Sequence, residues 1–268
     1  MKKLLILAMT SSIASSVSTA QDAAKPTLKL AVIGDSITQG GGPGEGEMEL
    51  SFRYPLWKNF VDAEMDVEMV GTVTQGFVRQ PDYPDYKGKV FDRRCEGYWG
   101  WPLTNPGNEE TSLNHKIKEN LTGKHFDMAI LEGGWNDLGQ PGFKKENFAD
   151  DAAHQKACVE GVVERVFTTL ETLHAINPKA VVYYPMLPAS WEPQTSINAA
   201  VKQKINERPA DAPPVVFVDI PGWVNKPDEP DTCTLDWVHT NERGDKIFAD
   251  ALFAAMKERL EKFYSAGN

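Results

Sequence analysis

Residues 28–38 read LKLAVIGDSIT. A short apolar run rich in β-branched residues, 28–33, ends abruptly at Gly34, Asp35 and Ser36. Such runs, bounded by turn residues, are typical of strands buried on both faces of a sheet. The serine therefore follows the end of a predicted strand, where its hydroxyl is exposed and backbone N–H groups can stabilise negative charge. A serine at this place can equally be an ordinary helix cap.

Four further runs of this kind alternate with helical patterns along the chain. The other predicted strands cover residues 66–73, 126–131, 180–186 and 215–220. The predicted helices cover residues 54–64, 112–121, 150–176, 196–207 and 242–264. This alternation predicts an α/β protein in three layers, α/β/α, with a parallel sheet of five strands covered by helices on both faces. Sites in open parallel sheets form beyond the carboxyl ends of the strands.

Composition places the chain among ordinary globular proteins. It has 268 residues, of which 41% are hydrophobic and 25% charged, and its formal net charge is −10. A chain of this length can bury a core without disulfide or metal staples. The acidic balance argues against nucleic acid or an anionic membrane surface as the main partner, because phosphates attract basic patches.

The first 20 residues have the pattern of a bacterial signal peptide. Lys2 and Lys3 precede a short apolar run, and Ser18-Thr19-Ala20 forms a small-residue cleavage pattern. We expect cleavage after Ala20 and a secreted or periplasmic protein with no membrane attachment afterwards. The rest, residues 21–268, is expected to be a single domain. The run is too short and too rich in serine to span a bilayer.

A second reactive group lies near the other end of the chain. Asp236-Trp237-Val238-His239 precedes the last predicted helix. A serine needs a base to remove its proton, and an imidazole is suited to this near neutral pH. The base in turn needs an acceptor that orients it, and a carboxylate three residues away can provide one.

Together these residues resemble the GDSL/SGNH hydrolase superfamily. Four blocks carry the resemblance in the order of that superfamily, each after a predicted strand or strand region: Gly34-Asp35-Ser36, Glu96-Gly97-Tyr98-Trp99-Gly100-Trp101, Gly134-Trp135-Asn136-Asp137 and Asp236-x-x-His239. The resemblance implies the SGNH hydrolase fold, which has a flavodoxin-like sheet. It also implies a serine hydrolase that needs no cofactor and no metal.

The same resemblance implies a role for individual residues. Ser36 matches the nucleophile, His239 the general base and Asp236 its orienting carboxylate. The backbone N–H of Ser36, the N–H of Gly97 and the side chain of Asn136 match the oxyanion hole. Gly100 is the competing choice for Gly97, because the block contains two glycines.

Two further stretches refine the expected substrate. Residues 52–57, FRYPLW, and 66–71, DVEMVG, are similar to carbohydrate esterase family 3. This implies removal of O-acetyl groups from a polysaccharide such as xylan. Trp99, Trp135 and Asp35 are the residues we expect to contact substrate, since indole rings offer flat apolar faces to sugars. A lipase, lysophospholipase or thioesterase on the same scaffold, and a catalytically silent carbohydrate-binding protein, remain as alternatives.

Secretion permits disulfides, and the chain has three cysteines. An odd number leaves at least one cysteine unpaired within the chain. Cys158 falls in a helical pattern and is expected to be a buried thiol. Cys95 and Cys233 both precede loops of the expected site, so a bridge between them is an open alternative.

Overall fold

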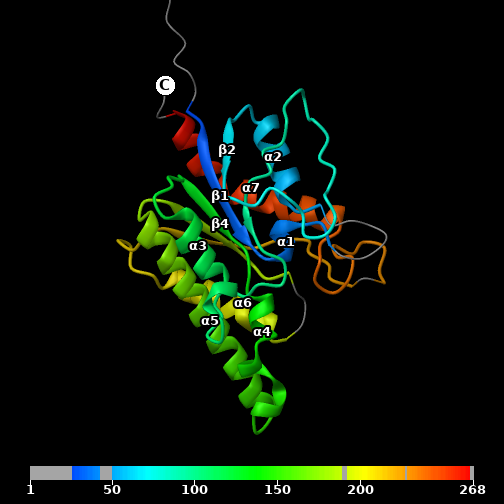
Figure 1. Ribbon diagram of the computed structural model, residues 1–268, viewed down its shortest axis with the longest axis vertical. Coiled ribbons are helices and arrows are strands. Elements are labelled where there is room, and N and C mark those ends of the chain that lie inside the picture. The colour runs from blue at the N-terminus through cyan, green and yellow to red at the C-terminus, as the bar shows by residue number, and fades with distance from the viewer. Residues whose placement is uncertain (1–25, 43–49, 189–191, 227, 266–268) are drawn as a thin grey trace, which may run out of the picture.

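The structure is a computed structural model, and it describes residues 26–42, 50–188, 192–226 and 228–265. The predicted signal peptide, residues 1–20, lies outside these ranges. Five of the strands form a parallel sheet in the order β2-β1-β4-β5-β6, as Figure 1 shows in part. Their bounds are Leu28–Gly34 for β1, Val67–Val70 for β2, Met128–Leu131 for β4, Val181–Pro185 for β5 and Val215–Val218 for β6. The predicted α/β fold and its parallel sheet are confirmed.

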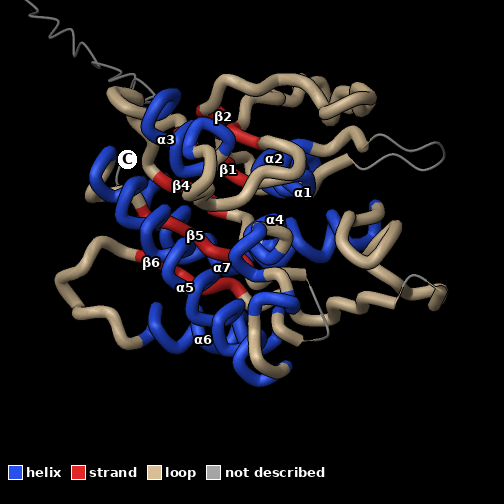
Figure 2. The backbone as a smooth tube through the Cα atoms, turned by 60° about the horizontal axis from the view of Figure 1, so that its bottom comes forward, coloured by secondary structure: helices blue, strands red, loops and turns tan. Residues whose placement is uncertain are grey.

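Residues of β1 alternate between two apolar cores, which explains why this strand is apolar on both faces. Leu30 and Val32 belong to one core, whereas Ala31 and Ile33 belong to the other. The first core is covered by α2 (Arg53–Asp62) and α7 (Glu242–Ser265). The second is covered by α3 (Leu113–Leu121), α5 (Asp151–Ile176) and α6 (Gln194–Asn206). Figure 2 shows the resulting three layers, with the strands between helices.

Helix boundaries agree closely with those that the sequence predicts. Ser112 caps α3 by accepting a hydrogen bond from the His115 N–H, and Asp150 caps α5 by accepting one from the Ala153 N–H. Capping side chains of this type satisfy the first free N–H groups of a helix. Two helices of four residues each were not predicted from the sequence: α1 (Ser36–Gln39) and α4 (Trp135–Leu138). Both follow the carboxyl end of a strand.

A sixth, two-residue strand, β3 (Glu96–Gly97), shares one edge of β1 with β2. The first half of β1 pairs with β2, and its last residues, Ile33 and Gly34, pair with β3. Between β2 and β3 the chain leaves the sheet and then returns to it. The two ends of this excursion, residues 72–94, are held together because Cys95 and Val73 form an antiparallel bridge. The chain thus re-enters the sheet beside the end of β1.

Phe248 of α7 is part of the first core. Its side chain is fully buried, and its ring centroid lies 4.6 Å from that of Phe52. Replacing Phe248 with Ala leaves a cavity, so we expect the free energy of unfolding to fall by about 3–5 kcal/mol. Urea denaturation measures this change. Val90→Ala, at a side chain that is 76% exposed, is the control and should change stability by less than about 0.5 kcal/mol. Equal effects of the two substitutions would contradict this description of the core.

Candidate active site

The candidate nucleophile begins helix α1, directly after β1. Gly34 ends the strand, and Asp35 caps the helix by accepting a hydrogen bond from the Ile37 N–H at 3.2 Å. Ser36 is therefore the first helical residue, and only 4% of it is exposed. The tight turn at the end of β1 thus fixes the backbone of Ser36 and, with it, the position of the Ser36 hydroxyl.

Ser36, His239 and Asp236 form one continuous line of hydrogen bonds. His239 Nε2 lies 3.0 Å from Ser36 Oγ, and His239 Nδ1 lies 2.8 Å from Asp236 Oδ2. Ser36 and His239 are 203 residues apart in the chain. The geometry is that of a nucleophile, a base and an orienting acid, in which each group lies within hydrogen-bond distance of the next.

The Asp236 carboxylate is held in its charged form by its own loop. Its Oδ1 accepts hydrogen bonds from the N–H groups of Val238 and His239, each at 2.7 Å. Burial alone would raise the pKa of Asp236, but the hydrogen bonds from the His239 ring and the two N–H groups outweigh it and lower this pKa to about 2. Asp236 therefore remains an acceptor for His239 throughout the neutral and mildly acidic range.

Asn136 lies next to the nucleophile turn on helix α4, which follows β4. Its Nδ2 donates a hydrogen bond to Asp35 Oδ2 at 2.9 Å. Gly133 and Gly134 connect β4 to α4 with φ values of 150° and 126°, a region that side chains rarely adopt. Glycine at these two positions thus allows the sharp turn that carries Asn136 toward Asp35.

Asp35 is almost completely buried, with 1% of its surface exposed. Its oxygens accept from Asn136 and from the Ile37 N–H. Burial raises the pKa of Asp35 to about 6. These contacts suit a residue that orients Asn136, whereas the sequence analysis expected Asp35 to contact substrate.

The two candidate oxyanion glycines occupy different surroundings. Gly97 is buried in β3, and a Cβ there would come within 2.8 Å of the Gln39 N atom. The next N–H, that of Tyr98, donates to Gly34 of β1 at 2.9 Å. Successive N–H groups of a strand point to opposite sides, so the Gly97 N–H points away from β1. Gly100 lies in the following turn at φ 77°, with open space where a Cβ would stand.

Trp99 packs directly against the candidate base. Its ring is stacked on that of His239, with centroids 4.6 Å apart, and on that of Phe77, with centroids 5.2 Å apart. Its backbone N–H donates to Gln39 Oε1 at 2.7 Å. Trp135 is half-buried and packs against both apolar cores. The structure thus places Trp99 against His239 and Trp135 at the start of α4, next to Asn136, and their contact with substrate stays a prediction.

Comparison with known proteins gives the family. Residues 32–247 match the model of the GDSL-like Lipase/Acylhydrolase family. The chain belongs to this family. The family assignment identifies the chain as an esterase of the GDSL/SGNH superfamily and confirms the resemblance that its four sequence blocks indicate. A search of curated proteins found no match.

Solved structures similar to this GDSL-family chain share its fold. A carbohydrate esterase family 3 from Talaromyces cellulolyticus has a TM-score of 0.62 at 21% identity, over 88% of this chain and 99% of that one. An acetyl esterase mutant with an acetate ion has a TM-score of 0.62 at 20% identity, over 88% and 99%. A family 3 carbohydrate esterase from Clostridium thermocellum has a TM-score of 0.58 at 19% identity, over 89% and 100%.

The cysteines of this GDSL-family chain do not form the bridge that we considered between Cys95 and Cys233. All three cysteines are free and buried. Cys95 is part of the core under α2, whereas Cys233 packs with its backbone against Gly244 at the start of α7. Cys158 is a buried thiol on α5, as its helical pattern indicates.

Arg53 supports the nucleophile turn from below, and the sequence analysis assigned it no role. It is 3% exposed, and its guanidinium donates to the backbone carbonyls of Thr38 at 2.7 Å, Gln39 at 3.3 Å and Arg93 at 2.7 Å. The available signal was its place in the FRYPLW stretch directly after the first block. Glu132, also unassigned, follows the buried strand β4 and carries a carboxylate at the end of an apolar run.

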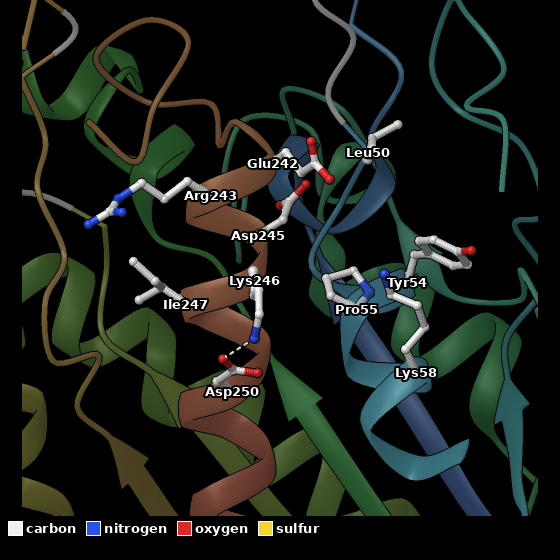
Figure 3. Close-up of a pocket in the computed structure, with 10 residues that line it drawn as sticks. All are labelled: Leu50, Tyr54, Pro55, Lys58, Glu242, Arg243, Asp245, Lys246, Ile247 and Asp250. Carbon is white, nitrogen blue, oxygen red and sulfur yellow. Dashed lines mark hydrogen bonds and ion pairs between the residues drawn. The ribbon is translucent and has the colours of Figure 1, made fainter. Parts of the chain in front are cut away.

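A separate hollow of about 500 Å³ lies between α2 and α7 (Figure 3). Ser36, His239 and Asp236 do not line it. Asp245, at its wall, is 2% exposed and accepts a hydrogen bond from Thr240 Oγ1 at 2.6 Å. Since Thr240 follows His239, Asp245 anchors the loop of the candidate base.

Among the helices of the described ranges, none has the length and apolar character to cross a membrane.

Asp236→Asn tests the role of the orienting acid. Asn cannot stabilise the imidazolium that forms when His239 accepts a proton, so we expect kcat for 4-nitrophenyl acetate to fall by up to about 10⁴-fold with little change in KM. Steady-state kinetics measure both. Asp231→Asn, at an exposed acid of the preceding loop, is the matched control. Wild-type kcat in Asp236→Asn would contradict the assignment.

Asp245 makes the stability of the protein depend on pH. Burial raises the pKa of Asp245 from 3.8 to about 7, so the folded state binds this proton more tightly than the unfolded state does. The free energy of unfolding should therefore fall as pH rises from about 4 to about 7. In Asp245→Asn this fall should be smaller, although Asp35 still contributes to it. Urea denaturation across this pH range measures the difference, and equal slopes in wild type and variant would exclude it; Asp211→Asn, an exposed acid, is the control.

Proposed function

We propose that this protein is a secreted or periplasmic carbohydrate acetylesterase. The observation that carries the proposal is the line of hydrogen bonds from Asp236 through His239 to Ser36, at 2.8 and 3.0 Å. An intact line of this kind argues for catalysis and against a silent carbohydrate-binding protein. Secretion rests on the signal-peptide pattern of residues 1–20.

In the proposed reaction Ser36 Oγ attacks the acetyl carbonyl carbon while His239 Nε2 takes the hydroxyl proton. The tetrahedral intermediate collapses when the bond to the sugar oxygen breaks, and His239 returns the proton to that oxygen. Water then attacks the acetyl-enzyme, again with His239 as base. This step releases acetate and restores the Ser36 hydroxyl. Asp236 remains charged and stabilises the imidazolium in both halves of the reaction.

We assign the oxyanion hole to the Ser36 N–H, the Asn136 side chain and the N–H of a glycine in the Glu96–Trp101 block. The expected glycine was Gly97. The pairing of β3 is compatible with Gly97, because its N–H points away from β1 and is not used in pairing with that strand, and Gly97 lies against Gln39 of α1. Gly100 stays the alternative. The Nδ2 group of Asn136 carries two hydrogens, so it can donate to Asp35 and to an oxyanion at the same time.

Exposed apolar side chains gather around the proposed catalytic residues. Among the described residues, four large apolar side chains are exposed, and two of them are aromatic: Phe77 at 49% and Trp237 at 53%. Phe77 stacks on Trp99, which stacks on His239, and Trp237 belongs to the Asp236–His239 loop. Flat apolar surfaces of this kind suit the faces of sugar rings. The similar structures described as carbohydrate and acetyl esterases support the same substrate class.

Ser36→Ala tests the proposed chemistry. We expect it to lower kcat for 4-nitrophenyl acetate by about 10⁴-fold or more, whereas Ser265→Ala, at an exposed serine, should have no effect. Acetate release from acetylated xylan, pectin, mannan and sialosides then identifies the sugar. If Ser36→Ala retained wild-type activity, the mechanism would be wrong. If rates rose with acyl length from acetate to octanoate, the chain would be a lipase or thioesterase rather than an acetylesterase.

A further inference from the structure

Glu132 is a fully enclosed carboxyl group that the proposed mechanism does not use. It follows the last residue of β4, and 1% of it is exposed. Its Oε2 accepts a hydrogen bond from Thr38 Oγ1 at 3.0 Å and one from the Asp35 N–H at 3.3 Å. These two residues lie on either side of Ser36 in the chain. Glu132 therefore holds the nucleophile turn from beneath at two points.

Gly34, at the end of β1, leaves the space that the Glu132 carboxyl and the Thr38 hydroxyl occupy. A Cβ on Gly34 would come within 2.1 Å of Thr38 Oγ1 and 2.5 Å of Glu132 Oε2. Any larger residue at the end of β1 would displace the Glu132 carboxyl or the Thr38 hydroxyl. The glycine of the first block thus serves the contact between Glu132 and Thr38.

Glu132 lies beside a second buried carboxyl, that of Asp35. Neither group forms an ion pair with a Lys or Arg among the described residues, and Glu132 Oε1 is buried there without a hydrogen-bond partner. Two adjacent buried carboxyls with no cation cannot both carry charge at low cost. Burial raises the pKa of Glu132 well above its ordinary value, and the charge of Asp35 raises it further.

We propose that the Glu132 carboxyl group is protonated and neutral. In this form Glu132 is a positioning residue for Asn136, the proposed oxyanion donor. It holds the Asp35 backbone, and the Asp35 carboxylate holds Asn136 Nδ2 at 2.9 Å. The contacts form a relay from the end of β4, through the nucleophile turn, to the proposed oxyanion donor on α4. The inference rests on the proposed function, because it assigns Glu132 to the orientation of Asn136 during ester hydrolysis.

The test compares two substitutions of different chemistry at this one position. Glu132→Gln keeps the shape, the neutrality and an oxygen that can accept from Thr38 and Asp35, so kcat for 4-nitrophenyl acetate should stay within about 3-fold of wild type. Glu132→Leu removes the acceptor, so kcat should fall by about 10²-fold with KM nearly unchanged, because a misplaced catalytic group costs about this much. Glu146→Gln, at an exposed acid, is the control.

An infrared difference spectrum of wild type minus Glu132→Gln, taken near neutral pH, measures the protonation state of Glu132 directly. A band of a protonated carboxylic acid that is present only in wild type is the expected result, and it decides the question of charge even if Glu132→Leu fails to fold. A carboxylate band in its place, or equal loss of kcat in Glu132→Gln and Glu132→Leu, would overturn the proposal, as would full activity in Glu132→Leu. Ser36→Ala in the same assay separates the two proposals: if it is inactive, failure of the Glu132 variants to behave as expected counts against Glu132 alone.

Discussion

The hydrogen bond between His239 Nε2 and Ser36 Oγ joins the first strand of the sheet to the loop before the last helix. It can form only because β1 lies inside the sheet, between β2 and β4, and because α7 packs on the same core as β1. The parallel direction of all strands then brings every functional segment to one edge. Ser36 follows β1, the Trp99 turn follows β3, and Asn136 follows β4. The position of one central strand thus determines where the chemistry can take place.

Beneath this edge lies a layer of buried polar groups. Arg53 donates to three backbone carbonyls, and Glu132 and Asp245 each accept a hydrogen bond from a threonine hydroxyl. Buried polar groups are costly unless they are hydrogen-bonded, so these contacts favour one arrangement of the nucleophile turn and the His239 loop. Each of the two loops is therefore fixed from within the protein, independently of the hydrogen bond that joins Ser36 to His239. Preorganised groups of this kind need little rearrangement when charge develops at a substrate.

The sequence was sufficient to predict the sheet, the five long helices and the three residues that hydrogen bonds join, Ser36, His239 and Asp236, because these depend on local patterns and on blocks with fixed spacing. It could not predict the supporting residues. Arg53 and Glu132 both contact Thr38, and nothing in the local pattern indicates which carbonyl or hydroxyl a buried polar side chain will meet. The same holds for the Cys95–Cys233 bridge, which was wrong: Cys95 joins the core under α2, whereas Cys233 lies against the start of α7. Only the folded chain defines these positions. The choice of Gly97 over Gly100 for the oxyanion hole stays a prediction.

The excursion formed by residues 72–94 begins and ends at neighbouring points, because Val73 and Cys95 are paired. The segment also contributes Tyr83 and Phe91 to the first core, and its Arg93 carbonyl accepts a hydrogen bond from Arg53. Phe77 is carried on this segment, and its N–H is bonded to the Gly40 carbonyl beside the nucleophile turn. The excursion therefore has an inner part that is tied to the core and an outer part at the exposed Phe77, where a substitution would reshape the surface beside Trp99 and His239 and leave the strands in place.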